Sequence, residues 1–156
     1  MERREFLALL GVAVASMPSA AQAEPAHPAE SIAGRLIGTW SFVSSVNTRK
    51  DGSTFDRWGA NPKGIFMFDR SGRYAQIIVG SESRVFGAKN TFSFGTYTVD
   101  EVQKLIVTHT DASSTSKFIG STQNRSILLL TAGELKYSNP LTSHGAVAEV
   151  LWKRAT

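Results

Sequence analysis

The sequence predicts an all-β fold, a single antiparallel up-and-down β-barrel of about eight or nine strands. Short runs rich in β-branched and aromatic residues follow one another from Gly38 to the end of the chain, and turn signals separate them. After Ile37 no helical period of useful length occurs. Strands linked by hairpins, with few helices, are typical of a sandwich or a barrel.

Two central segments favour the barrel over the sandwich. In Tyr74–Val79 and Phe94–Val99, both faces carry modest or amphipathic side chains. A dry sandwich core would present Leu, Ile and Val inward, whereas a barrel that holds a ligand mixes aromatic surface with a few Gln, Thr, Tyr and His groups. Hydrophobic residues make up 42% of the chain and charged residues 19%, so a packed core is also expected.

The folded domain is expected to begin near residue 32. Residues 24–31 contain two prolines among alanines and indicate a linker, and residues 32–37 are long enough for one short helical turn. The first strand is expected at Gly38–Val46. Its alternation predicts that four side chains share one face: Trp40, Phe42, Ser44 and Val46.

Turn chemistry separates the strands that follow. Asp69-Arg70-Ser71-Gly72 predicts a hairpin between strands at Ile65–Phe68 and Arg73–Val79, because the glycine supplies a positive φ. Asp51-Gly52 marks an earlier turn of the same kind. The remaining strands are expected at Thr54–Trp58, Phe92–Val99, Lys104–Thr110, Lys117–Gln123, Arg125–Leu130, Glu134–Ser138 and Ala146–Lys153.

Residues 1–23 have the organisation of a signal peptide. A charged start is followed by a short apolar run from Phe6 to Met17, then by Pro18 and by Ala21-Gln22-Ala23, whose small residues suit a signal peptidase. The apolar run is too short to cross a bilayer core of about 30 Å as a helix. We expect cleavage after Ala23 and a domain at 32–156; the alternative is a buried N-terminal helix.

The export route is indicated by the first residues. Arg3-Arg4-Glu5-Phe6-Leu7 resembles the twin-arginine signal, although Glu2 and Ala8 depart from its usual residues. The general secretory route is the alternative, and either one predicts a periplasmic or secreted protein. The chain contains no cysteine, so an exported domain would be held together by packing without disulfides.

Charge and motif content exclude several classes of function. The net charge is +4, but the basic residues are scattered, so no nucleic-acid surface is expected. No later stretch is apolar enough to span a membrane. The histidines, His27, His109 and His144, lack metal-ligand spacing, and paired carboxylates, nucleophile elbows and phosphate loops are missing. We expect no metal and no cofactor, and the oligomeric state stays open.

A series of landmarks gives the chain a family resemblance. They are Leu36-Ile37-Gly38-Thr39-Trp40, Asp51-Gly52, Trp58-Gly59 with Asn61–Gly64, Phe94-Gly95-Thr96-Tyr97 with Val99-Asp100, Val107-Thr108-His109, Gly120 with Gln123 and Arg125, and Leu151-Trp152-Lys153-Arg154. In this order they resemble the bacterial lipocalin-like domain family, small proteins built on a lipocalin-type barrel. The segment Gly80–Phe92 departs from the family, which often has a longer, partly helical insertion there.

The resemblance implies a closed end, and the lack of catalytic motifs favours a binding site inside the barrel. Gly38 and Trp40 would close one end, with Arg154 or else Arg125 packed over the indole by a cation–π contact. The interior would bind a small hydrophobic or amphipathic molecule. Apolar surface would come from Trp40, Phe42, Met67, Phe94 and Tyr97, and polar groups from Gln76, His109, Gln123 and Arg125.

Two alternative functions remain open. A cluster of His109, Tyr97 and Gln123 inside the barrel would support an isomerase or cyclase with His109 as proton acceptor. His109 could equally be a core histidine bonded to a neighbouring strand. The second alternative is an interaction domain with a filled core, which predicts no cavity above a few water volumes and an exposed apolar patch instead.

Overall fold

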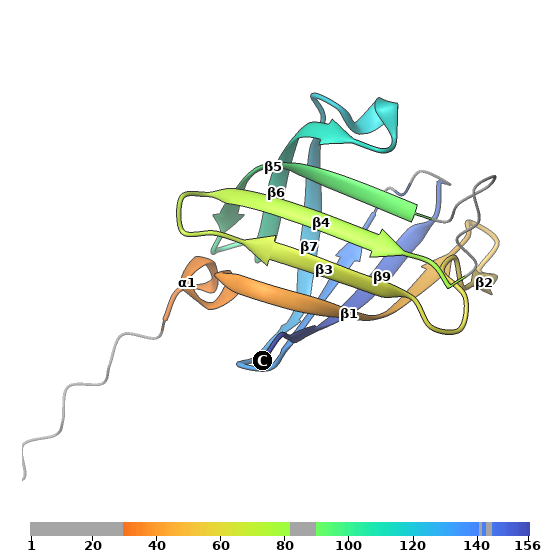
Figure 1. The fold of residues 1–156 in the computed structure, drawn as a ribbon, viewed down its shortest axis with the longest axis horizontal. Helices are drawn as coiled ribbons and strands as arrows, with labels where there is room; N and C mark the ends of the chain where they lie inside the picture. The colour runs from red at the N-terminus through yellow and green to blue at the C-terminus, as the bar shows by residue number, and fades with distance from the viewer. Residues whose placement is uncertain (1–29, 82–89, 141, 143–144) are drawn as a thin grey trace, which may run out of the picture.

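The computed structural model describes residues 30–81, 90–140, 142 and 145–156 (Figure 1). The predicted signal peptide and most of the predicted linker lie outside the described residues. The elements are α1 (Ile32–Leu36), β1 (Gly38–Thr48), β2 (Thr54–Phe55), β3 (Lys63–Phe68), β4 (Arg73–Val79), β5 (Asn90–Asp100), β6 (Leu105–Ser113), the 3₁₀ helix η1 (Ser116–Phe118), β7 (Thr122–Leu130), β8 (Glu134–Asn139) and β9 (Val147–Arg154). In the described part of the chain, no helix is long and apolar enough to cross a membrane.

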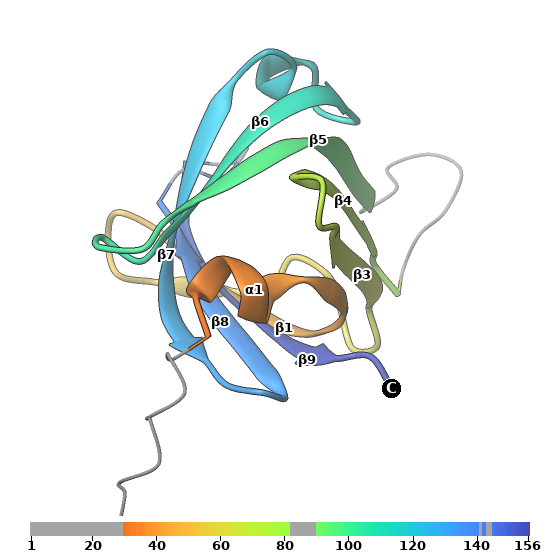
Figure 2. The ribbon, with the colours of Figure 1, turned by 90° about the vertical axis from the view of Figure 1, so that its left-hand side faces the viewer.

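Eight of the strands form a closed antiparallel barrel. From β3 to β9 each strand pairs with the next, β1 pairs with β3, and β9 returns to pair with β1 from Trp40↔Arg154 to Thr48↔Val147. The two-residue strand β2 adds to β1 outside this ring. Figure 2 looks along the barrel, with α1 in front of one opening. The predicted all-β, up-and-down, lipocalin-like barrel is therefore confirmed.

One predicted strand is wrong. Residues 117–123 do not form a strand of their own, because Ser116–Phe118 turns as a 3₁₀ helix in which the amide of Phe118 donates to the carbonyl of Thr115 at 2.9 Å. Gly120 then takes a φ of +73°, which an extended strand does not allow. The next strand begins only at Thr122.

A bulge in β1 changes which of its residues face inward, so the inner face expected from the sequence is wrong. The pairing of β1 with β9 shifts register between Phe42 and Ser44, so the alternation changes phase there. Beyond the bulge Asn47 is buried, whereas Val46 is 51% exposed. The four side chains expected on one face are therefore split, with only Trp40 and Phe42 on the core side.

Helix α1 closes one end of the barrel. Ser31 caps it by accepting a hydrogen bond from the Gly34 amide at 3.1 Å. The amides of Ile32 and Ala33 donate to the two carboxylate oxygens of Glu101, each at 3.0 Å. Because Glu101 lies in the turn between β5 and β6, these bonds fix the helix to the rim of the barrel.

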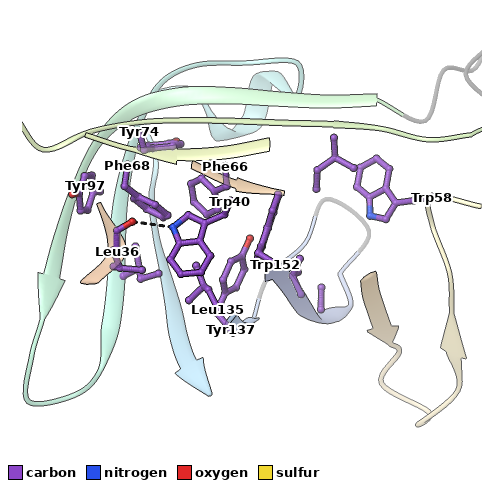
Figure 3. Close-up of a cluster of buried hydrophobic side chains, with 14 residues drawn as sticks. Leu36, Trp40, Trp58, Phe66, Phe68, Tyr74, Tyr97, Leu135, Tyr137 and Trp152 are labelled. Atoms are coloured by element: carbon purple, nitrogen blue, oxygen red, sulfur yellow. Dashed lines mark hydrogen bonds between the residues drawn. The ribbon is translucent and has the colours of Figure 1, made fainter. Parts of the chain in front are cut away.

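Under α1 lies a closely packed aromatic core (Figure 3). Trp40 is fully buried, and its indole nitrogen donates to the Leu36 carbonyl at 2.9 Å. The Arg154 guanidinium carbon stands 4.1 Å from the Trp40 ring centroid, and its nitrogens donate to the carbonyls of Ile37 and Arg35. Gly38, at φ +127°, leaves room for this arginine, since a Cβ there would lie 2.9 Å from Arg154 Nη1. Of the two arginines considered from the sequence, Arg154 covers Trp40.

Candidate ligand-binding cavity

At the other end of the barrel the interior contains a cavity of about 90 Å³. It lies among the strand ends farthest from α1, and we call this the open end. Its lining is mostly polar and consists of Ser45, Asn47, Arg57, Trp58, Gln76, Ile78, Thr91, Ser93, Thr110, Ser113, Thr115, Phe118, Gln123, Arg125, Tyr137, Asn139, Thr142, Ala148 and Val150. In Figure 3, Trp58 stands apart from the aromatic cluster.

The polar lining follows from the alternation of side chains along each strand. In β4, Tyr74 and Ile78 are buried, and Gln76 lies between them on the same face. In β6, Thr108 and Thr110 are buried in the same way. Small hydroxyl-bearing residues at these inward positions leave space that Leu or Phe would fill. The sequence of the strands thus produces both the cavity and its polarity.

Arg125 is the one charged residue among the buried residues described, with 4% of its surface exposed. Its Nη2 donates to Gln123 Oε1 at 3.0 Å, and its Nη1 donates to the Thr108 hydroxyl. The guanidinium carbon is 5.9 Å from the ring centroid of Phe66 and 5.7 Å from that of Tyr137. The Nε–H has no hydrogen-bond partner. The described groups in contact with this buried cation are therefore all neutral.

Gln76 adds a second unpartnered group. Its Oε1 is buried and accepts no hydrogen bond. Leaving a buried polar group unpaired costs about 1–3 kcal/mol, and such groups in proteins usually meet an ordered water or a ligand. The cavity therefore combines free space with two polar atoms that need partners, Arg125 Nε and Gln76 Oε1.

Arg57 and Trp58 lie at the mouth of the cavity. The guanidinium of Arg57 stacks 4.7 Å from the Trp58 ring centroid, and burial lowers the pKa of Arg57 from its ordinary value. The Trp58 amide donates to Asp56 at 2.8 Å, and its carbonyl accepts from the Ser81 amide at 3.0 Å. Deeper in the barrel, burial raises the pKa of Tyr137, so its hydroxyl stays protonated at neutral pH.

Three of the residues predicted from the sequence to bind a ligand line this cavity: Gln76, Gln123 and Arg125. The aromatic side chains of Trp40 and Tyr97 are buried in the core below it. The Tyr97 hydroxyl donates to the Asp69 carbonyl at 2.9 Å, which uses its donor within the closed end. Phe42 packs edge-on against Trp152 at 5.3 Å and Trp58 at 6.4 Å, between the two regions.

The other three predicted residues face away from the interior, and their expected placement is wrong. Met67 is 38% and Phe94 44% exposed, and His109 is also exposed, with its Nδ1 3.4 Å from the Thr122 hydroxyl. Alternation is the reason: Phe66 and Phe68 point inward on either side of Met67. Thr108 and Thr110 do the same around His109.

Several residues that line the cavity were not predicted from the sequence. Tyr137 and Asn139 continue the inward alternation that starts at Leu135 in β8, so that pattern could have identified them. Ser45 and Asn47 could not be found in this way, because the bulge in β1 changes which residues face inward.

The structure does not bring together the residues of the proton-transfer cluster expected from the sequence. The enzyme hypothesis needed His109 beside Tyr97 and Gln123 in the interior, and the structure puts these three side chains in separate places: outer face, closed end and cavity. No histidine or carboxylate is found among the described lining residues. Within the described chain, no group of three or more His, Cys, Asp or Glu residues could hold a metal ion.

No protein-family model and no curated protein matches the chain. Solved structures with a similar fold include a redesigned β-barrel (16% identity, TM-score 0.46, covering 80% of this chain and 95% of that one). Bovine odorant-binding protein with a selenium-containing odorant has 19% identity, a TM-score of 0.46, and coverage of 87% and 78%. A biogenic amine-binding protein has 11% identity, a TM-score of 0.49, and coverage of 77% and 64%. What these proteins bind is a property of those proteins.

Proposed function

We propose that this protein binds a small amphipathic molecule at the open end of its barrel. The observation that carries the proposal is the pair of buried, unpartnered polar atoms beside the cavity, Arg125 Nε and Gln76 Oε1. A buried polar group that lacks a partner costs free energy. A bound molecule with matching polar atoms removes the cost of both.

The size of the cavity limits what can enter. Its volume of about 90 Å³ is well below the roughly 150 Å³ of an engineered cavity that accepts benzene. Only a small polar group therefore fits inside. An open hollow of about 570 Å³ shares Phe118, Gln123 and Asn139 with the cavity and also includes Pro140 in its lining. The larger, less polar part of the molecule would lie there.

A matched pair of substitutions tests this function. Ala148 lines the cavity and is 4% exposed, whereas its neighbour Val147 points outward and is 43% exposed. Native mass spectrometry of the purified wild type should detect a retained small molecule, or one taken up from a cell extract. Ala148→Phe should abolish this retention and Val147→Phe should keep it. Equal retention by both variants, or none by the wild type, would contradict a ligand in the cavity.

The N-terminal sequence supports export, with cleavage after Ala23 and a periplasmic or secreted mature protein. Replacing Arg3 and Arg4 by lysines should leave uncleaved protein in the cytoplasm if the twin-arginine route is used. Normal export of the double variant would favour the general secretory route.

The closed end formed by Gly38, Trp40 and Arg154 supports membership of the bacterial lipocalin-like domain family, which is part of the same proposal.

An interaction domain is the second candidate function, and one observation favours it. Ile65, Ile77 and Phe92 are paired side by side across β3, β4 and β5, and each is at least 37% exposed. Met67, Val79 and Phe94 extend this outer apolar face. A second copy of the chain is the simplest occupant to test. Sedimentation of the wild type should then give a dimer that Ile77→Lys converts to a monomer; a monomeric wild type would exclude self-association.

A further inference from the structure

The charges around the cavity point to the chemical class of its ligand. We infer that the molecule carries a small anionic group, a carboxylate, that enters the cavity and binds the Arg125 guanidinium. This inference rests on the proposed function and adds the charge of the ligand to it. It depends on the position of Arg125, on the charges nearby and on the shape of the open end.

The first step concerns the uncompensated charge of Arg125. A buried ion costs several kcal/mol unless a counter-charge lies close to it. Among the described residues, Arg125 donates hydrogen bonds to the neutral groups of Thr108 and Gln123, and its aromatic neighbours are neutral as well. A water molecule would satisfy the free Nε–H, but it would not balance the charge. A carboxylate would do both.

The second step concerns the acids of the surrounding strands. In β6, Asp111 pairs with Arg73 at 3.1 Å, and in β9, Glu149 pairs with Lys136 at 2.6 Å. The carboxylate-bearing side chains of both pairs are 39% and 48% exposed, so they lie on the outer surface. Among the described residues, none of the cavity lining is acidic. The carboxylates of Asp111 and Glu149 thus lie outside the barrel, and no acidic side chain of the described lining lies beside Arg125.

The third step concerns the route into the site. Arg57 lies in the cavity lining beside Trp58, and Lys117 lines the adjoining hollow. The described lining of that hollow also contains no acidic residue. A cleft lined by one sign of charge raises the local concentration of oppositely charged molecules. Basic residues therefore lie along the described path to Arg125, which is compatible with an anionic group that enters the cavity first.

Three probes of equal chain length and different charge test the inference: hexanoate, hexan-1-ol and hexylamine. Nitrogen–proton NMR of the full mature protein resolves the Nε–H signal of arginines, so the free Nε–H of Arg125 reports binding directly. Hexanoate should shift this signal and bind at least tenfold more tightly than hexan-1-ol. Hexylamine should bind most weakly of the three.

Two substitutions at Arg125 distinguish the effect of its positive charge from the effect of its planar set of hydrogen-bond donors. Arg125→Gln should remove the preference for hexanoate, while Arg125→Lys should keep the preference but weaken hexanoate several-fold, because a point charge replaces the planar donor set. Arg70→Gln is the matched control, since Arg70 is exposed in the β3–β4 turn at the closed end. It should leave the affinity for hexanoate unchanged.

The outcomes distinguish this inference from the proposed function. If hexan-1-ol and hexanoate bind the wild type equally, the ligand class is wrong while the binding cavity stands. If none of the three probes shifts the signals of cavity residues, both proposals are overturned. If either Arg125 variant fails to fold, the affinities of the wild type for the three probes still test whether the ligand is an anion.

Discussion

The two ends of the barrel interior differ in the hydrogen bonding of their buried polar groups and in how closely their side chains pack. At the closed end, the indole of Trp40 and the guanidinium of Arg154 donate to nearby backbone carbonyls, and aromatic side chains fill the space, although the buried indole nitrogen of Trp152 in this core has no hydrogen-bond partner. At the open end, Gln76 and Arg125 have unpartnered atoms beside a cavity. Close packing and hydrogen-bonded polar groups stabilise a fold, whereas buried polar groups without hydrogen-bond partners destabilise it. The closed end therefore maintains the structure, and the cavity at the open end is the basis of the proposal that the protein binds a ligand there.

The largest expected effect is at the closed end. Trp40→Ala should lower the free energy of unfolding by about 3–5 kcal/mol, because it empties a fully buried site that the surrounding barrel cannot refill. Urea denaturation followed by circular dichroism would measure the loss. Ser93→Ala at the open end should change it by less than about 1 kcal/mol, because Ser93 borders space that is already present. Similar losses for the two variants would remove the distinction between the ends.

Arg154 gives the next largest effect. Arg154→Ala removes the cation over Trp40 together with hydrogen bonds to Ala132, Ile37 and Arg35, and should cost about 2–3 kcal/mol in unfolding free energy. The neighbouring Lys153 is exposed, so Lys153→Ala should stay within about 0.5 kcal/mol. Thermal denaturation of the two variants compares them directly. Equal melting temperatures would show that Arg154 does not hold the closed end together.

The open end should respond in the opposite direction. Arg125→Met removes an uncompensated buried charge and fills similar volume, so the free energy of unfolding should be unchanged or higher by about 1 kcal/mol in the absence of ligand. Chemical denaturation of the ligand-free variant measures this. A loss of more than about 2 kcal/mol would show that Arg125 supports the fold through Thr108 and Gln123, as Arg154 supports the closed end.

Much of the closed end could be predicted from the sequence, because a family resemblance and local turn signals both apply there. The resemblance implies that Gly38 and Trp40 close one end under an arginine, and the structure shows the cation–π contact of Arg154 with Trp40. The hairpin at Asp69–Gly72 was equally readable. Strands β3 to β6 lie within a few residues of the predicted segments for the same reason.

The open end was harder to predict, because it depends on which side chains face inward. The bulge after Phe42 moves Ser45 and Asn47 into the cavity, and a second register shift follows Phe94. An error of one residue in the alternation along a strand assigns a side chain to the opposite face. For this reason His109 is predicted inside the barrel, whereas it lies outside. Arg125 and Gln76 were found from the sequence, but only the folded chain reveals which of their polar atoms lack partners.

The smallest expected effect compares two turns, one at each end. The backbone amide of Arg73 and the groups of Ser71 lower the pKa of Asp69 in the β3–β4 turn, and hydrogen bonds from Ser53 lower the pKa of Asp51 in the β1–β2 turn. A carboxyl with a lowered pKa in the fold contributes stability above its unfolded pKa of about 4, and the contribution is lost as the pH falls through the folded value.

Only one of these turns should influence global unfolding. The Asp69 turn joins two strands of the closed ring, whereas the Asp51 turn leads to β2, which lies outside the ring and can open locally. Asp69→Asn should therefore reduce the fall in melting temperature on acidification from about pH 5 towards pH 2, and Asp51→Asn should leave the wild-type profile unchanged. Melting curves across this range provide the measurement. If Asp51→Asn flattens the profile as much as Asp69→Asn, β2 must unfold together with the barrel, and the rim of the open end is more firmly held than its unpaired groups suggest.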